Sequence, residues 1–519
     1  MLKNEIYLSK TSSINQIKLG AIMSYLAIFF NIIAGLVYTP WMIRQIGRAD
    51  YGLYALAGCF LSYFMMDFGL GSAIARFISK YRAEGRDEDV GGLLGLTTKL
   101  YLLIDLCILL TLVVLFFFIE NIFLELNMEE IRKFRVIFCI TGLFSIVSFP
   151  FMPLNSVLIA YERFFMLKLC DLLSKIFTIS LIVVALIAGY KLYALVAVQA
   201  LVGIVLIFIK YLYMFKAITV KVNFSYFNYD LLKQLLGFSV WVSVIGIAQR
   251  LLISITPAIL GIFSGTDEIA TFSIGMTIEA YSWMFASALG GFFLPKVSRL
   301  MATDNREEVL SLMIKIGRIQ LFVVGIIITG FITLGKQFIT LWVGADFKHS
   351  YLVVLFLTIP GLITLTQQIA YTMLNVVNKL KYWALLFIVG SLLSIGLSVA
   401  LSPRYGAIGS SIGIFTALVL CHIIGMNIIY YKVLKLDVGR FFCECHLKIA
   451  LPLILSLGVG FLINVSIPAN SLVAFLPKAG LLAVLYATFM WILGLNRDEK
   501  QLIRSFAHKL PFIGNLITL

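Results

Sequence analysis

The fold is decided first by residues 19–40, which read LGAIMSYLAIFFNIIAGLVYTP and hold no charged residue. A helix needs roughly 20 apolar residues to cross the hydrocarbon of a bilayer, and this run is long enough. It is too long for the apolar core of a cleavable signal peptide, so we expect a first membrane span that stays in place. The preceding residues 1–18 carry Lys3, Lys10 and Lys18 and form a short N-terminal segment.

The composition of the whole chain agrees with this first run. Of its 519 residues, 61% are hydrophobic and 13% are charged, whereas soluble domains hold about 45–50% apolar and about 25% charged residues. A soluble fold is therefore excluded. The net charge of +15 does not indicate a nucleic-acid partner here, because basic loops orient membrane proteins against the cytoplasmic face.

Further apolar runs of the same kind follow along the chain, and an all-α polytopic membrane protein with about fourteen transmembrane helices is predicted. The expected spans are residues 19–40, 51–72, 91–119, 136–160, 169–188, 192–214, 238–262, 269–292, 310–334, 349–374, 382–402, 407–430, 449–466 and 479–494. The segments between them are short, which leaves no room for a separate soluble domain.

The positions of lysine and arginine predict the orientation of these spans. With a cytoplasmic N-terminus, 28 of the 41 basic residues lie on the cytoplasmic side and 10 on the opposite side. The outer group includes Arg44, Arg48, Lys336, Lys348 and Arg404. Both termini of this multi-pass membrane protein are therefore expected in the cytoplasm.

A weak internal repeat divides the first twelve spans. Asp50 and Asp267 precede spans six apart, and the turn at Tyr193 corresponds to the turn at Gly406. An even separation preserves orientation, so the repeat is parallel, and transporters often bind substrate between such halves. We expect a cytoplasmic N-terminal segment at 1–18, six-helix bundles at 19–214 and 238–430, a cytoplasmic linker at 215–237, and two peripheral helices with a cytoplasmic tail at 431–519.

Two ionisable residues lie deep in predicted spans. Arg250 and Glu279 lie at a similar distance from the outer ends of consecutive antiparallel spans, and buried charges in membranes usually line a cavity or pair with each other. The guanidinium of Arg250 does not lose its proton in hydrocarbon. Either these residues face a cavity that binds an anionic substrate, or they form a structural ion pair between helices.

Other intramembrane charges are weaker candidates for substrate contacts. They are Asp67, Arg76, Lys99, Asp105 and Lys175. Lys175 can also pair with Asp171 four residues earlier on the same helix face, and Arg76 can reach the membrane surface.

Breaks in the helices are also predicted. The small residues around Gly69 and Gly71 permit backbone bending or close helix packing. Prolines interrupt backbone hydrogen bonding in three predicted spans, at Pro150 and Pro153, at Pro257 and at Pro360.

Motifs of soluble enzymes are missing from the sequence. There is no phosphate-cradling GxxxxGK[ST] loop, no HExxH and no GxSxG. Cys443 and Cys445 lack a second pair of ligands at a spacing typical of zinc sites. No cofactor, no metal and no catalytic residue is expected, so the chain is predicted not to be an enzyme.

Five short motifs, taken in their order along the predicted spans, carry a family resemblance. They are IGRADYGLY at 46–54, DFGLG at 67–71 with Arg76, LPKVSRL at 294–300, LWVG at 341–344 and YGAIG at 405–409. With them the chain resembles the Wzx-type polysaccharide flippases of the multidrug/oligosaccharidyl-lipid/polysaccharide superfamily over essentially its whole length.

The resemblance implies a function as well as a fold. Such proteins move oligosaccharides linked to undecaprenyl pyrophosphate to the outer leaflet by alternating access without ATP. The implied partners are the lipid-linked oligosaccharide and membrane lipids, with a polysaccharide polymerase and a chain-length regulator as further candidates. Lipid II flippases of the superfamily have basic residues in helix 1, whereas here Asn31 is the one strongly polar residue, which favours an O-antigen, capsule or teichuronic-acid-like unit.

Two alternatives stay open. One is a cation-coupled multidrug exporter of the same superfamily, which requires an acidic cavity. The other is a membrane polysaccharide polymerase or glycosyltransferase, which requires an ordered outer loop with paired carboxylates.

Overall fold

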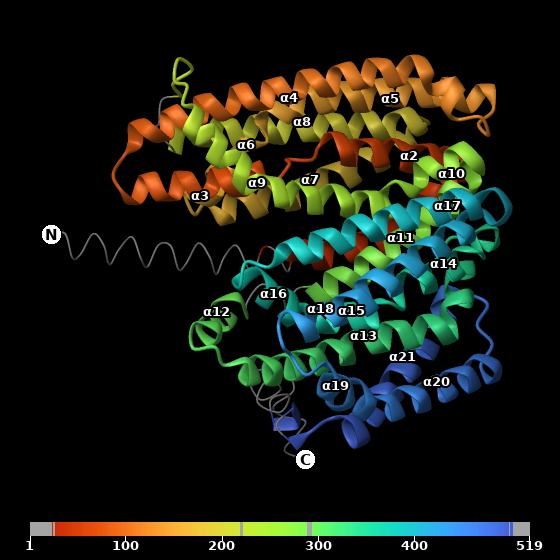
Figure 1. The fold of residues 1–519 in the computed structure, drawn as a ribbon. Coiled ribbons are helices and arrows are strands. Elements are labelled where there is room, and N and C mark those ends of the chain that lie inside the picture. Colours follow the sequence, from red (N-terminus) through yellow and green to blue (C-terminus); the bar gives the residue numbers. More distant parts are fainter. Residues whose placement is uncertain (1–22, 24–25, 218–221, 288–292, 498, 502–519) are drawn as a thin grey trace. The chain divides into compact units, whose positions relative to one another are not determined.

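The computed structural model of the chain describes residues 23, 26–217, 222–287, 293–497 and 499–501 (Figure 1). Every regular element in this described part is helical. The predicted cytoplasmic segment at 1–18 and most of the predicted tail lie outside the described residues.

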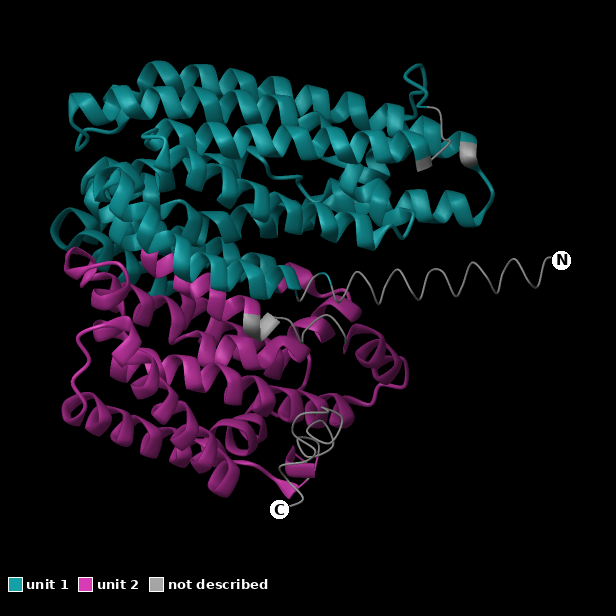
Figure 2. Cartoon of the chain, turned by 180° about the vertical axis from the view of Figure 1, so that it is seen from behind, with its two compact units in different colours: residues 1–273, 383–417 teal, residues 274–382, 418–519 magenta. Residues whose placement is uncertain are grey.

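The chain divides into two compact units (Figure 2). The first unit comprises residues 1–273 and 383–417. Its elements are the helix Leu26–Ile46, α2 (Arg48–Phe64), α3 (Leu70–Ala83), α4 (Asp87–Ile122), α5 (Met128–Ser148), η1 (Phe149–Phe151), α6 (Pro153–Ala160), α7 (Phe164–Ile187), α8 (Leu192–Ala217), α9 (Tyr229–Gln249), the π-helical turn η2 (Arg250–Ser254), α10 (Thr256–Phe263), the start of α11 (Thr266–Ser287) and most of α17 (Leu380–Ala417).

The second unit comprises residues 274–382 and 418–519. Its elements are the remainder of α11, α12 (Leu294–Ala302), α13 (Arg306–Trp342), η4 (Ala345–Phe347), α14 (Ser350–Thr358), α15 (Gly361–Thr364), η5 (Leu365–Gln367), α16 (Gln368–Val376), η6 (Leu418–Gly425), α18 (Met426–Lys432), α19 (Val438–Phe441), η7 (Phe442–Leu447), α20 (Lys448–Ser466), α21 (Leu472–Phe489) and η8 (Met490–Gly494).

The all-α polytopic fold is confirmed, but the count of fourteen spans is not. By length and composition, the described residues hold ten helices able to cross a membrane, or eleven when the bent segment Tyr229–Ser254 counts as one. One of the ten, Leu380–Lys432, covers two predicted spans. The predicted span 51–72 is missing from the ten because α2 is only 17 residues long and separate from α3.

The backbone breaks follow the sequence signals. Pro150 and Pro153 lie where α5 gives way to η1 and α6, and Pro360 lies between α14 and α15. In α17, Gly406 adopts φ 54° and ψ −135°, and a Cβ on Gly409 would lie 2.5 Å from the Leu401 carbonyl oxygen. The two arms of α17 therefore fold back on each other at Gly406, as predicted for the turn between spans 382–402 and 407–430.

The bounds of the two units differ from those of the two predicted six-helix bundles. Residues 383–417 belong to the first unit because α17 bonds to elements of that unit. The Ser394 hydroxyl donates to the Leu252 carbonyl at 3.0 Å, and the Ala407 amide donates to the Glu268 carboxylate at 2.8 Å. The repeat and its two bundles stay a prediction.

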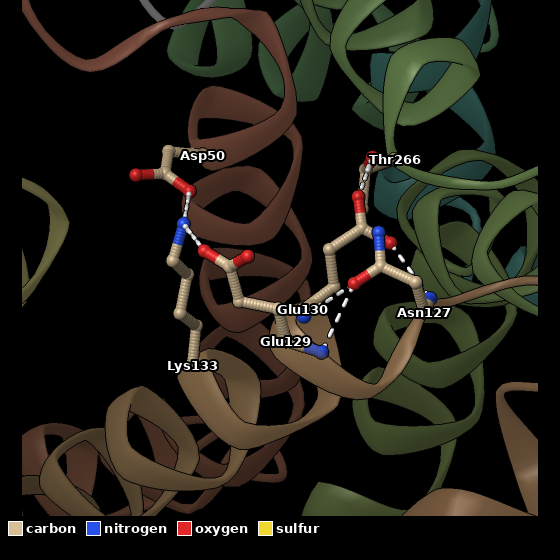
Figure 3. A network of polar contacts seen from close by, with 6 residues as sticks. All are labelled: Asp50, Asn127, Glu129, Glu130, Lys133 and Thr266. Carbon is tan, nitrogen blue, oxygen red and sulfur yellow. Dashed lines mark hydrogen bonds and ion pairs between the residues drawn. The ribbon is translucent and has the colours of Figure 1, made fainter.

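A polar network joins the first turn of α5 to α2 and α11 within the first unit (Figure 3). Asn127 caps α5 through the amides of Glu129 and Glu130, and the Glu130 carboxylate accepts the Asn127 amide in return. The same Glu130 carboxylate accepts the Thr266 hydroxyl at 2.6 Å. Lys133, one turn further, pairs with Asp50 at 3.0 Å. Reciprocal capping of this kind stabilises a helix start and here also fixes the neighbouring elements.

Candidate functional site

Two broken helices of the first unit pack against each other, and each break contacts the other helix. The first break separates α2 from α3, where Phe68 has φ 52° and Gly69 has φ 69°. Left-handed backbone is open to glycine but costly for phenylalanine, so it needs outside support. The Gly69 amide donates to the Asp67 carboxylate at 3.0 Å, and Ser243 of α9 contacts the Phe68 carbonyl.

The second break is the π-helical turn η2 between α9 and α10. A π-helical turn leaves backbone groups without regular helical partners, and such turns are frequent at functional sites. Its carbonyls at Arg250, Leu252 and Ser254 accept hydrogen bonds from Tyr63 at 3.0 Å, Ser394 at 3.0 Å and Cys59 at 2.8 Å. Pro257 follows at the start of α10, and its backbone nitrogen carries no hydrogen to donate. The turn is therefore tied to α2 and α17 by three side chains.

Arg250 opens this π-helical turn and is half-buried. Its Nε donates to the Ser62 carbonyl at 2.9 Å, and its Nη1 donates to the Gly246 carbonyl at 3.3 Å. A guanidinium has five N–H donors, and the described residues provide no recorded acceptor for Nη2. Backbone carbonyls thus position the cation without neutralising it, which leaves donors for an anionic group.

Glu279 lies on α11 in the second unit, whereas Arg250 lies in the first. Glu279 is half-buried. The predicted common depth and the predicted ion pair of these two residues stay predictions.

Asp67 and Asp105 are both inside the first unit. Asp67 lies at the break after α2, with its carboxylate bonded to the Gly69 amide. Asp105 of α4 is 7% exposed, and its Oδ1 has no hydrogen-bond partner among the described residues. A buried carboxylate oxygen without a donor is costly and indicates a functional role or an unseen ligand.

The remaining predicted residues lie at the surface of the first unit. Arg76, Lys99 and Lys175 are exposed. Lys99 donates to the Tyr226 carbonyl at 3.2 Å. The predicted pair of Asp171 with Lys175 is wrong, because Asp171 pairs with Lys168 at 3.3 Å. At i−3, Lys168 reaches the carboxylate as readily as a partner at i+4.

Two buried cations of the second unit were not predicted from the sequence. Arg318 is 2% exposed and bonds to Glu499 at 2.6 Å, while Lys478 is 2% exposed and donates to Gln337 at 2.6 Å. Arg318 lies within the predicted span 310–334, which was a signal of its burial. Its partner lies 181 residues away in the sequence, and no local pattern identifies such a partner.

No metal site accompanies these charges. Within the described residues, no group of three or more His, Cys, Asp or Glu side chains is placed to hold a metal ion.

Comparisons with known proteins agree with the fold. A family model described as polysaccharide biosynthesis protein matches residues 17–301. No curated protein matches the sequence.

Solved membrane transporters share the fold at low identity. A structure described as lipid II flippase MurJ in an inward closed conformation has a TM-score of 0.69 and 18% identity, and covers 91% of this chain and 98% of its own. An inward-facing multidrug resistance MATE family transporter of the MOP superfamily has a TM-score of 0.64 and 13% identity, over 80% of this chain and 98% of its own. A MOP superfamily transporter from Pyrococcus furiosus has a TM-score of 0.52 and 16% identity, over 80% of this chain and 93% of its own.

Proposed function

Since the chain belongs to the polysaccharide biosynthesis protein family, we propose that it flips undecaprenyl-pyrophosphate-linked oligosaccharide units from the inner to the outer leaflet. The movement is alternating access, in a multi-pass protein of the bacterial inner membrane with both termini in the cytoplasm. The chain acts as a transporter and not as an enzyme. It passes its substrate to a polysaccharide polymerase with a chain-length regulator.

The observation that best supports this proposal is the position of Arg250. Arg250 lies at a π-helical break within a membrane helix, held by carbonyls at Ser62 and Gly246, with donors left over. Discontinuous helices with unpaired charges are where transporters bind anionic and ionic substrates. A pyrophosphate is an anion that a guanidinium binds through several charge-assisted hydrogen bonds.

The similar structures and the first predicted span support a narrower substrate class. The structure with the TM-score of 0.69 is a lipid II flippase, whose substrate is also lipid-linked. The one strongly polar residue of span 19–40 is Asn31, which lacks the charge that lipid II flippases carry in helix 1. We therefore favour an O-antigen, capsule or teichuronic-acid-like repeat unit.

The test is export by an Arg250→Ala variant in a strain that lacks the native gene. A hydrogen bond to a charged group contributes about 1.5–3 kcal/mol, so export falls by about tenfold to a hundredfold. Lipid-linked repeat units accumulate on the inner side, while the variant protein reaches the membrane in normal amounts. Surface polysaccharide and extracted lipid-linked sugars are the two readouts.

Arg404→Ala is the matched control, because Arg404 is an exposed arginine of the same unit and its loss leaves export unchanged. Normal export by Arg250→Ala contradicts the role of this residue. Loss of the protein from the membrane instead indicates that Arg250 acts in folding.

The similar MATE transporter makes multidrug export the second candidate. It predicts that deletion of the gene sensitises cells to cationic drugs and leaves surface polysaccharide intact. The flippase proposal predicts the reverse pattern.

A further inference from the structure

A groove of about 490 Å³ lies at one end of the first unit. Its walls come from three places in the chain, namely the connection from Leu26–Ile46 to α2, the first turns of α5, and the turn between α7 and α8. This volume is in the range of small-molecule binding sites. The basic-residue pattern predicts that this end of the unit faces outwards.

Left-handed glycines lie in two turns at this end of the unit. Gly47, which lines the groove, has φ 89° in the turn before α2, and a Cβ built on it would have no atom within 4 Å. Gly189 has φ 88° in the turn before α8. Glycine adopts this backbone conformation without strain, and at Gly47 it adds no side chain to the groove.

Cations dominate the charged lining. Three of the lining residues are basic and one is acidic, namely Arg48, Lys133, Lys191 and Asp50. Lys133 lies between Asp50 and Glu129, at 3.0 Å from each (Figure 3). Arg48 donates to Thr271 at 2.8 Å. These two cations are therefore held in place before any ligand arrives, which lowers the entropy lost on binding.

Lys191 differs from the other two. It is exposed, and among the described residues no ion pair or hydrogen bond of its side chain is recorded. Its charge is thus the one in the groove that a ligand can neutralise without displacing a protein carboxylate.

The apolar part of the lining selects the kind of ligand. Ile46 and Leu192 are 8% and 1% exposed, whereas Tyr193 is 43% exposed. An acyl chain finds little free apolar surface here. The C–H face of a sugar ring can pack on the electron-rich face of a tyrosine, while its hydroxyls and a carboxylate meet the charged residues.

We propose that this groove binds an acidic saccharide, with the sugar ring on Tyr193 and the sugar carboxylate on Lys191. The proposal rests on the proposed function, because it takes the glycan of the transported unit as the ligand. It makes this outer end of the first unit a second contact for the glycan, separate from Arg250.

The test measures binding of a fluorescent glucuronic-acid-containing tetrasaccharide to the purified full-length protein in detergent. We expect saturable binding that weakens as salt is raised, because an exposed charge contact is screened. Lys191→Glu weakens this binding by about tenfold or more, a loss of the size expected for one charge-assisted contact. Tyr193→Ala weakens it as well. Arg404→Glu, which reverses an exposed charge outside the groove, leaves it unchanged.

Three outcomes overturn the proposal. The first is equally tight binding of a neutral maltotetraose. The second is an unchanged affinity in Lys191→Glu. The third is complete displacement of the acidic tetrasaccharide by phosphatidylglycerol in nanodiscs, which assigns the groove to a lipid headgroup.

The same assay on Arg250→Ala separates this proposal from the proposed function. Because Arg250 does not line the groove, that variant binds the tetrasaccharide normally. If the tetrasaccharide binds in the groove and Arg250→Ala exports normally, only the proposed role of Arg250 is contradicted. If the tetrasaccharide does not bind and Arg250→Ala is defective in export, only the groove proposal is contradicted.

Discussion

Arg318 and Arg250 are both arginines within apolar helices, but their surroundings differ. The Arg318 guanidinium meets both oxygens of Glu499, at 2.6 and 3.0 Å, and the carbonyls of Glu444 and Gly494. Each of its three nitrogens thus donates to an acceptor inside the protein. Arg250 meets two carbonyls and no recorded carboxylate among the described residues. The first arrangement stabilises the fold, whereas the second leaves a cation available for a substrate.

We expect Arg318→Ala to lower the stability of the protein by about 3–5 kcal/mol, because it leaves Glu499 buried without its partner. The side chains of the pair are 2% and 7% exposed, so solvent cannot replace the lost contact. Thermal unfolding in detergent measures the effect. The double variant Arg318→Met with Glu499→Leu recovers part of the loss, since it removes both charges. An unfolding midpoint of Arg318→Ala equal to that of Arg404→Ala contradicts this account.

Glycines of α4 allow the chain before α9 to pack closely against this helix. The chain before α9 lies on the start of α4, where the Asn223 amide donates to the Gly91 carbonyl at 3.0 Å. A Cβ on Gly92 would lie 2.7 Å from the Tyr226 ring, and a Cβ on Gly95 would lie 1.9 Å from the Asn223 carbonyl oxygen. The described part of the predicted cytoplasmic linker 215–237 is therefore packed on α4 through glycine contacts.

Gly95→Ala should displace this segment from α4, because the added methyl overlaps the Asn223 carbonyl. Overpacking of this kind costs about 1–3 kcal/mol. Chymotrypsin then cleaves faster after the aromatic residues Phe224, Tyr226 and Phe227. The control is Gly330→Ala in α13, where a Cβ would meet no atom within 4 Å and where alanine favours the helix by about 0.5–1 kcal/mol. Equal cleavage rates in the two variants would contradict the packing argument.

The sequence predicted these elements better than it predicted their breaks. Apolar runs and prolines marked the spans and three of the interruptions, because both act locally along the chain. The π-helical turn at Arg250 depends on donors from Cys59, Tyr63 and Ser394. Those donors are far from Arg250 in the sequence and are not visible in a local pattern.

Part of the candidate site was predictable, because its signal is also local in the sequence. Arg250, Asp67 and Asp105 stand out because a charge in an apolar run is conspicuous. The groove beside Arg48 and Lys191 was not predicted, since its residues lie in three separate loops that only the folded chain brings together. The Arg318–Glu499 pair escaped prediction in the same way.

The proposed alternating access requires contacts at the predicted outer end of the protein to open and close. In the first unit, Arg48 at the start of α2 donates to Thr271 of α11 at 2.8 Å and lies 3.7 Å from the Asp267 carboxylate. A Cβ on Gly52 would lie 2.1 Å from the Thr266 carbonyl oxygen, so α2 and the start of α11 touch at the backbone. These contacts join the predicted first half to the predicted second half, and in this structure they are closed.

Loss of Arg48 should therefore favour opening at this end. Ala270 is fully buried beside these contacts, so a cysteine placed there reports on opening. In a variant without the seven native cysteines, we expect Arg48→Ala to raise the rate at which an impermeant maleimide labels Ala270→Cys from outside the cell. Arg48 contributes a partly exposed ion pair with Asp267 and hydrogen bonds to the Asp267 carbonyl and the Thr271 hydroxyl. Together these contacts are worth about 1–3 kcal/mol, so labelling rises by roughly fivefold to a hundredfold. Arg404→Ala leaves the rate unchanged, because Arg404 takes no part in these contacts. If labelling is as slow with Arg48→Ala as with Arg404→Ala, Arg48 does not control opening at this end, and the closed contact rests on the backbone packing at Gly52.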